Sequence, residues 1–216
     1  MKPPVDWGLY LVTDRALAGT RPLDELVRAA VRGGVSVVQL REKDLPAREF
    51  IQLARRIKAF LRSEGVPLII NDRVDVALAA EADGVHVGQS DMDYRDAREL
   101  MGEAALVGLS VETPEQALEA AGLDVDYLGV SPIFPTPTKT DTTTDWGIDG
   151  LARLRRRSQH PLVAIGGINA GNAARVLEAG ADGIAVVSAV CAAPDPEAAA
   201  RELRVIVEQT RTTGRR

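Results

Sequence analysis

The sequence predicts an α/β protein, a single-domain (β/α)₈ TIM barrel. Two observations favour this fold class. Short runs of β-branched and other apolar residues alternate with longer amphipathic segments along the chain of 216 residues. The alternation repeats eight times, which is the number of strand–helix units that closes a parallel barrel. A doubly wound open sheet is the alternative that the same alternation allows.

The expected strands are apolar runs of four to six residues. They span Gly8–Thr13, Val35–Leu40, Pro67–Ile70, Gly84–Val87, Ala105–Leu109, Tyr127–Val130, Leu162–Ile165 and Gly183–Val187. Two of them follow matching turns, Ala82-Asp83-Gly84 and Gly180-Ala181-Asp182-Gly183. Short glycine-containing turns of this kind are typical of the entry into a strand.

The expected helices fill the segments between the strands and have one apolar face. They span Leu23–Arg32, Ala47–Glu64, Arg73–Ala80, Asp93–Met101, Pro114–Ala121, Ile148–Arg157, Ala170–Ala179 and Pro196–Thr210. Gly34-Val35 and Gly65-Val66 follow two of them, as expected where a helix ends on glycine and a strand begins. We therefore expect one barrel domain over residues 1–210 and a flexible tail over residues 211–216.

Composition and charge exclude several classes of partner. The net charge of −5 argues against nucleic acid, whose binding proteins usually carry a basic stripe. No apolar stretch reaches the length of a membrane span, and the first residues lack the apolar segment of a signal peptide. Cys191 is the single cysteine, so an intrachain disulfide is impossible. We expect a cytoplasmic protein that binds small molecules, and the sequence leaves open whether it forms a homo-oligomer.

Polar side chains end the second expected strand, in the segment QLREKD. Gln39, Arg41 and Lys43 share one face of an extended chain with the apolar residues before them. This places them at the carboxyl end of the strand, where barrels form their sites. Two cations beside an amide indicate a polyphosphate ligand, because burying both cations without an anion is unfavourable. The alternative is a surface ion cluster with Glu42 and Asp44.

Carboxylates follow the third and fourth expected strands. Asn71-Asp72 comes directly after the third strand, and Asp91 comes shortly after the fourth. Because the ends of adjacent parallel strands are close in space, Asp72 and Asp91 could hold one Mg²⁺ together with substrate phosphate oxygens. The alternative is that Asp72 caps the third helix and that Asp91 or Ser90 caps the fourth.

Ser110 ends the fifth expected strand, where we expect it to hydrogen-bond the substrate. A nucleophilic serine needs a base, and neither His86 nor His160 lies in a recognisable triad pattern. His86 lies inside an apolar run, which favours a hydrogen-bonded residue of the core over a metal ligand. The sequence has no His/Cys cluster typical of zinc.

Turns typical of phosphate binding follow the seventh and eighth expected strands. These are Gly166-Gly167 and Val187-Ser188, at the place where (β/α)₈ barrels frequently bind a phosphate. The sixth strand is followed by a long Pro- and Thr-rich segment, residues 131–147, and loops of this length often act as lids. Within it, Thr136, Thr138 and Lys139 could hold an oxyanion or form part of an ordinary polar loop.

These residues, in this order, resemble those of the thiamine phosphate synthase family. The resemblance spans nearly the whole chain and is carried by YLVTD (10–14), QLREKD (39–44), ND (71–72), DGVHVGQSD (83–91), Ser110, PIFPTPTK (132–139), GGI (166–168) and VS (187–188). QLREKD and PTPTK are highly specific as a pair. Two features depart from the family pattern: Ser131 stands where many members have glycine, and residues 141–146 are less patterned. We expect the latter to form a mobile lid.

The resemblance implies a Mg²⁺-dependent transferase that joins hydroxymethylpyrimidine diphosphate to a (carboxy)thiazole phosphate and releases diphosphate. It assigns the pyrimidine diphosphate to Gln39, Arg41, Lys43, Asn71, Ser110 and Lys139, the thiazole phosphate to Thr136, Thr138, Gly167, Val187 and Ser188, and Mg²⁺ to Asp72 and Asp91. The expected catalytic residues are Arg41, Lys43, Ser110 and Lys139. The family's reaction is regarded as dissociative, which agrees with the lack of a recognisable nucleophile in this sequence.

Two other functions stay open at this point. The related thiazole tautomerase, an isomerase of the same fold, has a histidine two residues after the serine of the fifth strand, where this sequence has Glu112. A barrel that binds phosphate without catalysis and regulates a partner would not need both carboxylates, and a fold alone does not decide between these functions.

Overall fold

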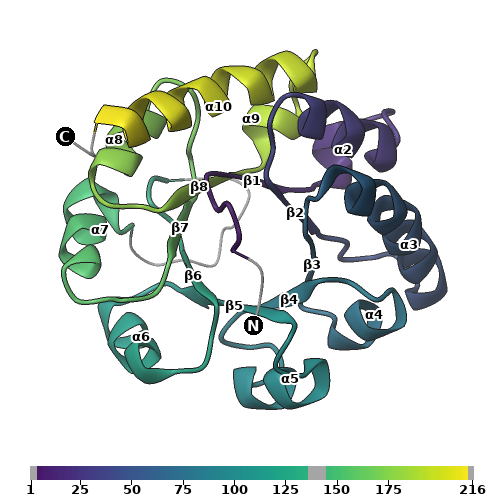
Figure 1. Ribbon diagram of the computed structural model, residues 1–216, viewed down its shortest axis with the longest axis horizontal. Coiled ribbons are helices and arrows are strands. Elements are labelled where there is room, and N and C mark those ends of the chain that lie inside the picture. The colour runs from purple at the N-terminus through teal and green to yellow at the C-terminus, as the bar shows by residue number, and fades with distance from the viewer. Residues whose placement is uncertain (1–3, 136–144, 214–216) are drawn as a thin grey trace.

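The protein folds as a closed barrel of eight parallel strands with helices around it (Figure 1). The computed structural model describes residues 4–135 and 145–213. The strands are β1 (Leu9–Val12), β2 (Val37–Leu40), β3 (Leu68–Asn71), β4 (Gly84–Val87), β5 (Leu106–Val111), β6 (Tyr127–Val130), β7 (Leu162–Ile165) and β8 (Gly183–Val186). Neighbours in sequence pair with one another, and β1 also pairs with β8. This pairing confirms the predicted TIM barrel and excludes the open sheet.

The helices cover the outside of the barrel (Figure 1). They are α1 (Arg15–Ala18), α2 (Leu23–Arg32), α3 (Ala47–Glu64), α4 (Val74–Ala79), α5 (Tyr94–Met101), α6 (Pro114–Glu119) with the 3₁₀ turn η1 (Ala120–Gly122), α7 (Gly147–Arg155), α8 (Ala173–Glu178), α9 (Ser188–Cys191) and α10 (Pro196–Thr213). All the expected helices are present, with small shifts of their ends. The short helices α1 and α9 were not expected, because one helical turn is too short to show a periodicity. No helix in the described ranges is long and apolar enough to cross a membrane.

Apolar side chains form one layer between the strands and the helices and another inside the barrel. Strand alternation separates them, so that Leu9 of β1 packs in the outer layer and Tyr10 in the inner one. Leu, Ile, Val and Ala dominate the outer layer, as the low aromatic content predicts. The interior differs, because Trp7, Tyr10 and Tyr127 pack together there, with the ring centroids of Trp7 and Tyr127 4.4 Å apart.

The helix α10 runs past the expected domain limit at residue 210 and ends at Thr213. Its side chains bind the segment before β1: Arg211 Nη1 lies 2.6 Å from Asp6 Oδ1, and Arg204 Nη1 lies 2.7 Å from Asp6 Oδ2. Burial raises the pKa of Asp6, but hydrogen bonds from Arg204, Arg211 and the Gly8 N–H more than offset this effect and lower the pKa to about 2. Residues 211–213 therefore belong to the helix that fastens the N-terminal segment to the barrel.

We expect Asp6→Asn to lower the melting temperature by about 2–4 °C, corresponding to about 1 kcal/mol, because the ion pairs are partly exposed and screened by water. A depressed carboxyl pKa stabilises the fold above the unfolded-state pKa of about 3.9. This stabilisation is lost as the pH falls through the native pKa of about 2. Thermal unfolding of both proteins over a pH series should therefore show a difference at neutral pH that shrinks in acid. A difference that is constant over the whole series would contradict the assignment.

Candidate active site

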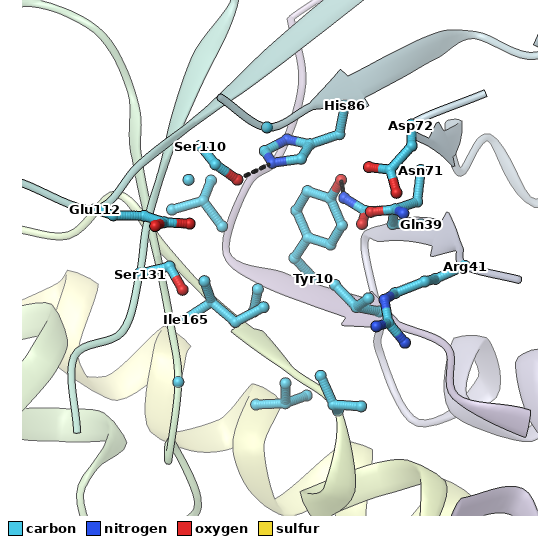
Figure 2. Close-up of a pocket in the computed structure, with 18 of the residues that line it drawn as sticks. Tyr10, Gln39, Arg41, Asn71, Asp72, His86, Ser110, Glu112, Ser131 and Ile165 are labelled. Carbon is cyan, nitrogen blue, oxygen red and sulfur yellow. Dashed lines mark hydrogen bonds between the residues drawn. The ribbon is translucent and has the colours of Figure 1, made fainter. Parts of the chain in front are cut away.

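A cavity of about 740 Å³ opens at the carboxyl ends of the strands (Figure 2). Every predicted site residue that the structure describes lines this cavity. These residues are Gln39, Arg41, Lys43, Asn71, Asp72, Asp91, Ser110, Gly167, Val187 and Ser188. The predicted residues Thr136, Thr138 and Lys139 lie outside the described residues, as do residues 141–144 of the expected lid. The sequence segments thus converge at one rim, while the roles of their side chains stay predictions.

The cations of the segment after β2 belong to the cavity and not to a surface cluster. Glu42, which separates Arg41 from Lys43 in sequence, forms its ion pair with Arg15 of α1, with 2.7 Å between Arg15 Nη2 and Glu42 Oε1. Lys43 Nζ instead lies 3.0 Å from Asp72 Oδ2. Both Arg41 and Lys43 line the cavity, so their charges are available to an anionic ligand there.

The two predicted metal ligands interact directly at the rim of the cavity. Asp72 follows β3 with a φ of 62°, a left-handed conformation that Asp adopts more readily than most residues. Its carboxylate is close enough to that of Asp91 to raise the pKa of Asp91. Neither caps a helix: Arg73 holds the N-cap position of α4, and Asp93 caps α5 by accepting a hydrogen bond from the Arg95 N–H. The capping alternative is therefore wrong for both residues.

The electrostatics of this pair fit a divalent cation. Burial raises the pKa of Asp91, and the neighbouring Asp72 carboxylate raises it further, against the effects of the Gly88 N–H and of Lys43. Two adjacent carboxylates repel each other unless a proton or a cation lies between them. Mg²⁺ commonly takes one or two carboxylates and fills its remaining positions with water and substrate phosphates. Among the described residues, no group of three or more His, Cys, Asp or Glu side chains could hold a metal, so substrate and water would supply the other ligands.

Glycines shape the turn after β7. Gly166 and Gly167 have φ values of 106° and 65°, a region that other residues rarely adopt. A Cβ atom on Gly167 would lie 2.9 Å from the Cβ of Phe134 and 3.0 Å from the carbonyl oxygen of Pro135. On the neighbouring strand, Ser188 begins the short helix α9 after β8. Both turns line the cavity, at the place where (β/α)₈ barrels frequently bind a phosphate.

A chain of hydrogen bonds crosses the floor of the cavity. Figure 2 shows its last bond, between His86 and Ser110. Gln39 Nε2 donates to the Tyr10 hydroxyl at 2.9 Å, and the hydroxyls of Tyr10 and Tyr127 are 2.7 Å apart. His86 Nδ1 lies 2.9 Å from the Tyr127 hydroxyl, and His86 Nε2 lies 2.8 Å from Ser110 Oγ. The prediction that His86 is a hydrogen-bonded residue of the core is confirmed. Its direct bond to Ser110 was not predicted.

Several residues of the cavity were missed by reasoning from the sequence. Tyr10, His86 and Tyr127 carry polar groups on inward-facing strand positions, so strand alternation contained a signal that could have placed them in the barrel. Gln89 and Glu112 also line the cavity, and Gln89 Nε2 donates to the Ser110 carbonyl oxygen at 2.6 Å. These two residues lie just beyond β4 and β5, where no periodicity predicts the direction of a side chain.

Comparison with known proteins identifies the family. The family described as thiamine monophosphate synthase matches residues 9–190. This chain belongs to that family. The thiamine-phosphate synthase of Albidiferax ferrireducens is 58% identical over 200 residues, covering 93% of this chain and 91% of the relative. That of Syntrophomonas wolfei is 53% identical over 204 residues, covering 94% of this chain and 98% of the relative.

Solved structures place the whole barrel in the same family. The thiamine phosphate pyrophosphorylase from Pyrococcus furiosus superposes with a TM-score of 0.87 and is 41% identical in sequence. The match covers 95% of this chain and 97% of that one. Membership of the thiamine monophosphate synthase family thus extends over all eight strands and the cavity that they form.

Proposed function

We propose that this protein joins hydroxymethylpyrimidine diphosphate to a thiazole phosphate, forming thiamine phosphate and releasing diphosphate. The supporting observation is a joint one. Relatives named thiamine-phosphate synthase match more than nine-tenths of the chain, and cations, carboxylates and two phosphate-type turns line a single cavity. Such a cavity offers one anionic site for each substrate. The cytoplasmic location stays a prediction, and the oligomeric state stays open.

The pyrimidine diphosphate is assigned to the side of the cavity formed by β2, β3 and β5. Arg41 pairs there with diphosphate oxygens through its planar guanidinium, and Lys43 acts as a point charge. The remaining residues assigned to this substrate are Gln39, Asn71, Ser110 and Lys139. The assignment is supported by the position of Arg41 and Lys43 on the cavity wall and by the contact of Lys43 Nζ with Asp72 Oδ2 at 3.0 Å.

Asp72 and Asp91 would hold Mg²⁺ beside the diphosphate. Bound there, Mg²⁺ supplies positive charge to the oxygens of the leaving group. Lys43, 3.0 Å from Asp72, keeps that carboxylate at the rim and brings a second positive charge close to the same oxygens. The raised pKa of Asp91 next to Asp72 supports a site where a cation would relieve the repulsion of the two carboxylates.

The reaction begins with cleavage of the bond between the methylene carbon and the diphosphate oxygen. The electron pair of that bond goes to the leaving oxygen, where Arg41 and Lys43 stabilise the growing negative charge. The electron-rich aminopyrimidine ring stabilises the cation left on the methylene carbon. The thiazole nitrogen then donates its electron pair to this carbon and forms the new bond.

The thiazole is held in line for this attack by its phosphate. The residues assigned to that phosphate are Thr136, Thr138, Gly167, Val187 and Ser188. Fixing the second reactant in line supplies the proximity that a dissociative reaction needs, because the cation must be captured before water reaches it. No side chain forms a covalent bond. His86 is not set up as the base of a nucleophilic Ser110, since its Nδ1 lies against the Tyr127 hydroxyl and not against a carboxylate that would stabilise an imidazolium ion.

The decisive experiment is to incubate the purified protein with both substrates and Mg²⁺. We expect thiamine phosphate and diphosphate to form in equal amounts. Interconversion of thiazole tautomers without thiamine phosphate would identify the isomerase instead. Binding of phosphate ligands with no product would identify a regulatory barrel. Either of these results would overturn the proposed function.

We expect Gly167→Ala to raise the KM for the thiazole phosphate by about tenfold or more, because the added methyl group displaces the turn from the phosphate by a few tenths of an ångström. Gly65→Ala is the matched control: Gly65 has nearly the same φ, 67° against 65°, and no atom lies within 4 Å of an added Cβ. Both variants should lose a similar, small amount of stability from the left-handed backbone. An equal KM in the two variants would contradict the assignment of this turn to the phosphate.

A further inference from the structure

The hydrogen-bond chain on the cavity floor can be read in only one direction. Gln39 Nε2 is an amide nitrogen, so it donates to the Tyr10 oxygen. The Tyr10 proton then points to the Tyr127 oxygen, and the Tyr127 proton points to His86 Nδ1. Because Nδ1 accepts, the single proton of a neutral imidazole lies on Nε2 and points to Ser110 Oγ.

The reverse direction would leave a buried proton unpaired. Tyr10 would then accept hydrogen bonds from both Gln39 and Tyr127, and its own proton would have no acceptor among the described residues. The Tyr10 side chain is buried in the barrel, where an unpaired hydroxyl proton is unfavourable. The forward direction pairs the hydroxyl protons of both tyrosines and the imidazole proton with acceptors, and it leaves only the Ser110 proton to face the cavity.

Both phenols take part as neutral hydroxyls. Burial raises the pKa of Tyr10 and that of Tyr127 well above the usual range, so each carries one proton at any physiological pH. Each phenol can therefore donate only one hydrogen bond. Because each hydroxyl has one proton to donate, the hydrogen bond from Gln39 to Tyr10 sets the direction of every later bond, as far as Ser110.

Gly108 on β5 leaves the space in which the rings of Tyr127 and His86 meet. A Cβ atom on Gly108 would lie 2.2 Å from Tyr127 Cζ and 2.5 Å from His86 Nδ1. Gly108 pairs in register with His86 on one side and with Tyr127 on the other. At position 108 the strand between the two rings thus carries no side chain, and His86 Nδ1 and the Tyr127 hydroxyl meet across it at 2.9 Å.

We propose that Tyr127 and His86 are positioning residues that hold Ser110 as a hydrogen-bond donor towards the ring of the pyrimidine substrate. Ser110 Oγ accepts from His86 Nε2, so its own proton is directed to a ligand in the cavity that it lines. An aminopyrimidine ring nitrogen is an acceptor, and the same chain would disfavour a ring that presents an N–H at that position. The inference rests on the proposed function for the identity of this ligand.

The tautomer of His86 is measurable without any substrate. The ¹⁵N chemical shifts of a histidine ring distinguish its protonated nitrogen from its unprotonated one, and this chain has only two histidines. At a pH above the usual histidine range we expect Nε2–H for His86 in the free protein. A ring with its proton on Nδ1, or with a proton on both nitrogens, would overturn the inference even if the protein makes thiamine phosphate.

Two variants separate positioning from packing, since each keeps the aromatic ring. Tyr127→Phe removes the group that faces His86 Nδ1, so we expect the nitrogen shifts of His86 to approach each other. Its KM for the pyrimidine diphosphate should rise about tenfold, the loss of one hydrogen bond. Tyr10→Phe removes the link between Gln39 and Tyr127 that sets this direction, so the nitrogen shifts of His86 should move in the same sense but by a smaller amount. Tyr94→Phe, on the outer helix α5, is the control and should change neither quantity.

A further pair of variants tests the hydrogen bond from His86 to Ser110 alone. His86→Gln retains an N–H near the position of Nε2, whereas His86→Leu retains none. We expect His86→Gln to recover a measurable part of the pyrimidine affinity that His86→Leu loses, at similar melting temperatures. Equal KM values for these two variants, or a wild-type KM in Tyr127→Phe, would contradict the inference. Absence of thiamine phosphate with the unchanged protein would instead contradict the proposed function.

Discussion

Replacement of Asp91 by asparagine lowers turnover at limiting Mg²⁺ by about 100-fold or more, because several kcal/mol of charge stabilisation in the transition state depend on the metal. Asparagine keeps an oxygen for the hydrogen bond that the Gly88 N–H donates to Asp91 Oδ2 at 2.8 Å. The variant therefore removes the charge and preserves the turn. Raising the Mg²⁺ concentration should restore part of the activity, and turnover over a Mg²⁺ titration is the measurement.

The same variant is expected to be at least as stable as the parent protein. Burial and the Asp72 carboxylate raise the pKa of Asp91 above its unfolded value, so the ionised group destabilises the fold at neutral pH. Removing the charge removes this effect, and the melting temperature without Mg²⁺ should not fall. Asp93→Asn is the control, because Asn caps a helix as well as Asp does, and it should leave both quantities unchanged. Near-normal turnover of Asp91→Asn at limiting Mg²⁺ would refute the metal role.

The barrel was predictable because its information is local and repeated. Each strand is a short β-branched run and each long helix an amphipathic segment, so one missed element would not have changed the fold class. The alternation also placed Gln39 on the same face of β2 as the apolar residues before it, and Val37 lies inside the barrel as Gln39 lines the cavity. What the sequence did not show were α1 and α9, each a single turn, and the end of α10, where polar residues continue a helix without an apolar signal.

The site was predictable as far as it depends on strand ends. Residues directly after a parallel strand meet at one rim, and this placed Arg41, Asp72 and Asp91 around the cavity. Partnerships between strands were not predictable in the same way. The contact of His86 with Ser110 and Tyr127 depends on the register of three strands and on a glycine at position 108, and a single sequence does not give a register.

Replacement of Arg41 by methionine should have the second large effect, a fall of about 10²–10³ in kcat/KM for the pyrimidine diphosphate, as for loss of one preorganised donor to a developing anion. Arg41 is positioned by its backbone N–H, which donates to Thr13 Oγ1 at 3.0 Å, while its guanidinium is held loosely, with Nη1 3.5 Å from Asp14 Oδ2. Its side chain is 28% exposed, so little stability depends on it.

Arg41→Lys tests whether charge alone suffices at this position. Lysine keeps the charge but loses the planar pair of donors that matches a phosphate, so we expect an activity between those of the parent and of Arg41→Met. Arg48→Met, on the exposed first turn of α3, controls for the loss of one positive charge from the surface and should change little.

The assignment of the two substrates to separate parts of the cavity also predicts how Arg41→Met changes each KM. Because Arg41 is assigned to the diphosphate, the KM for the thiazole phosphate should stay within about twofold of the parent value, a change of roughly 0.4 kcal/mol at most. Equal increases in the two KM values would mean that the cations and the strand seven and eight turns serve one ligand, and the assignment of separate sites would have to be abandoned.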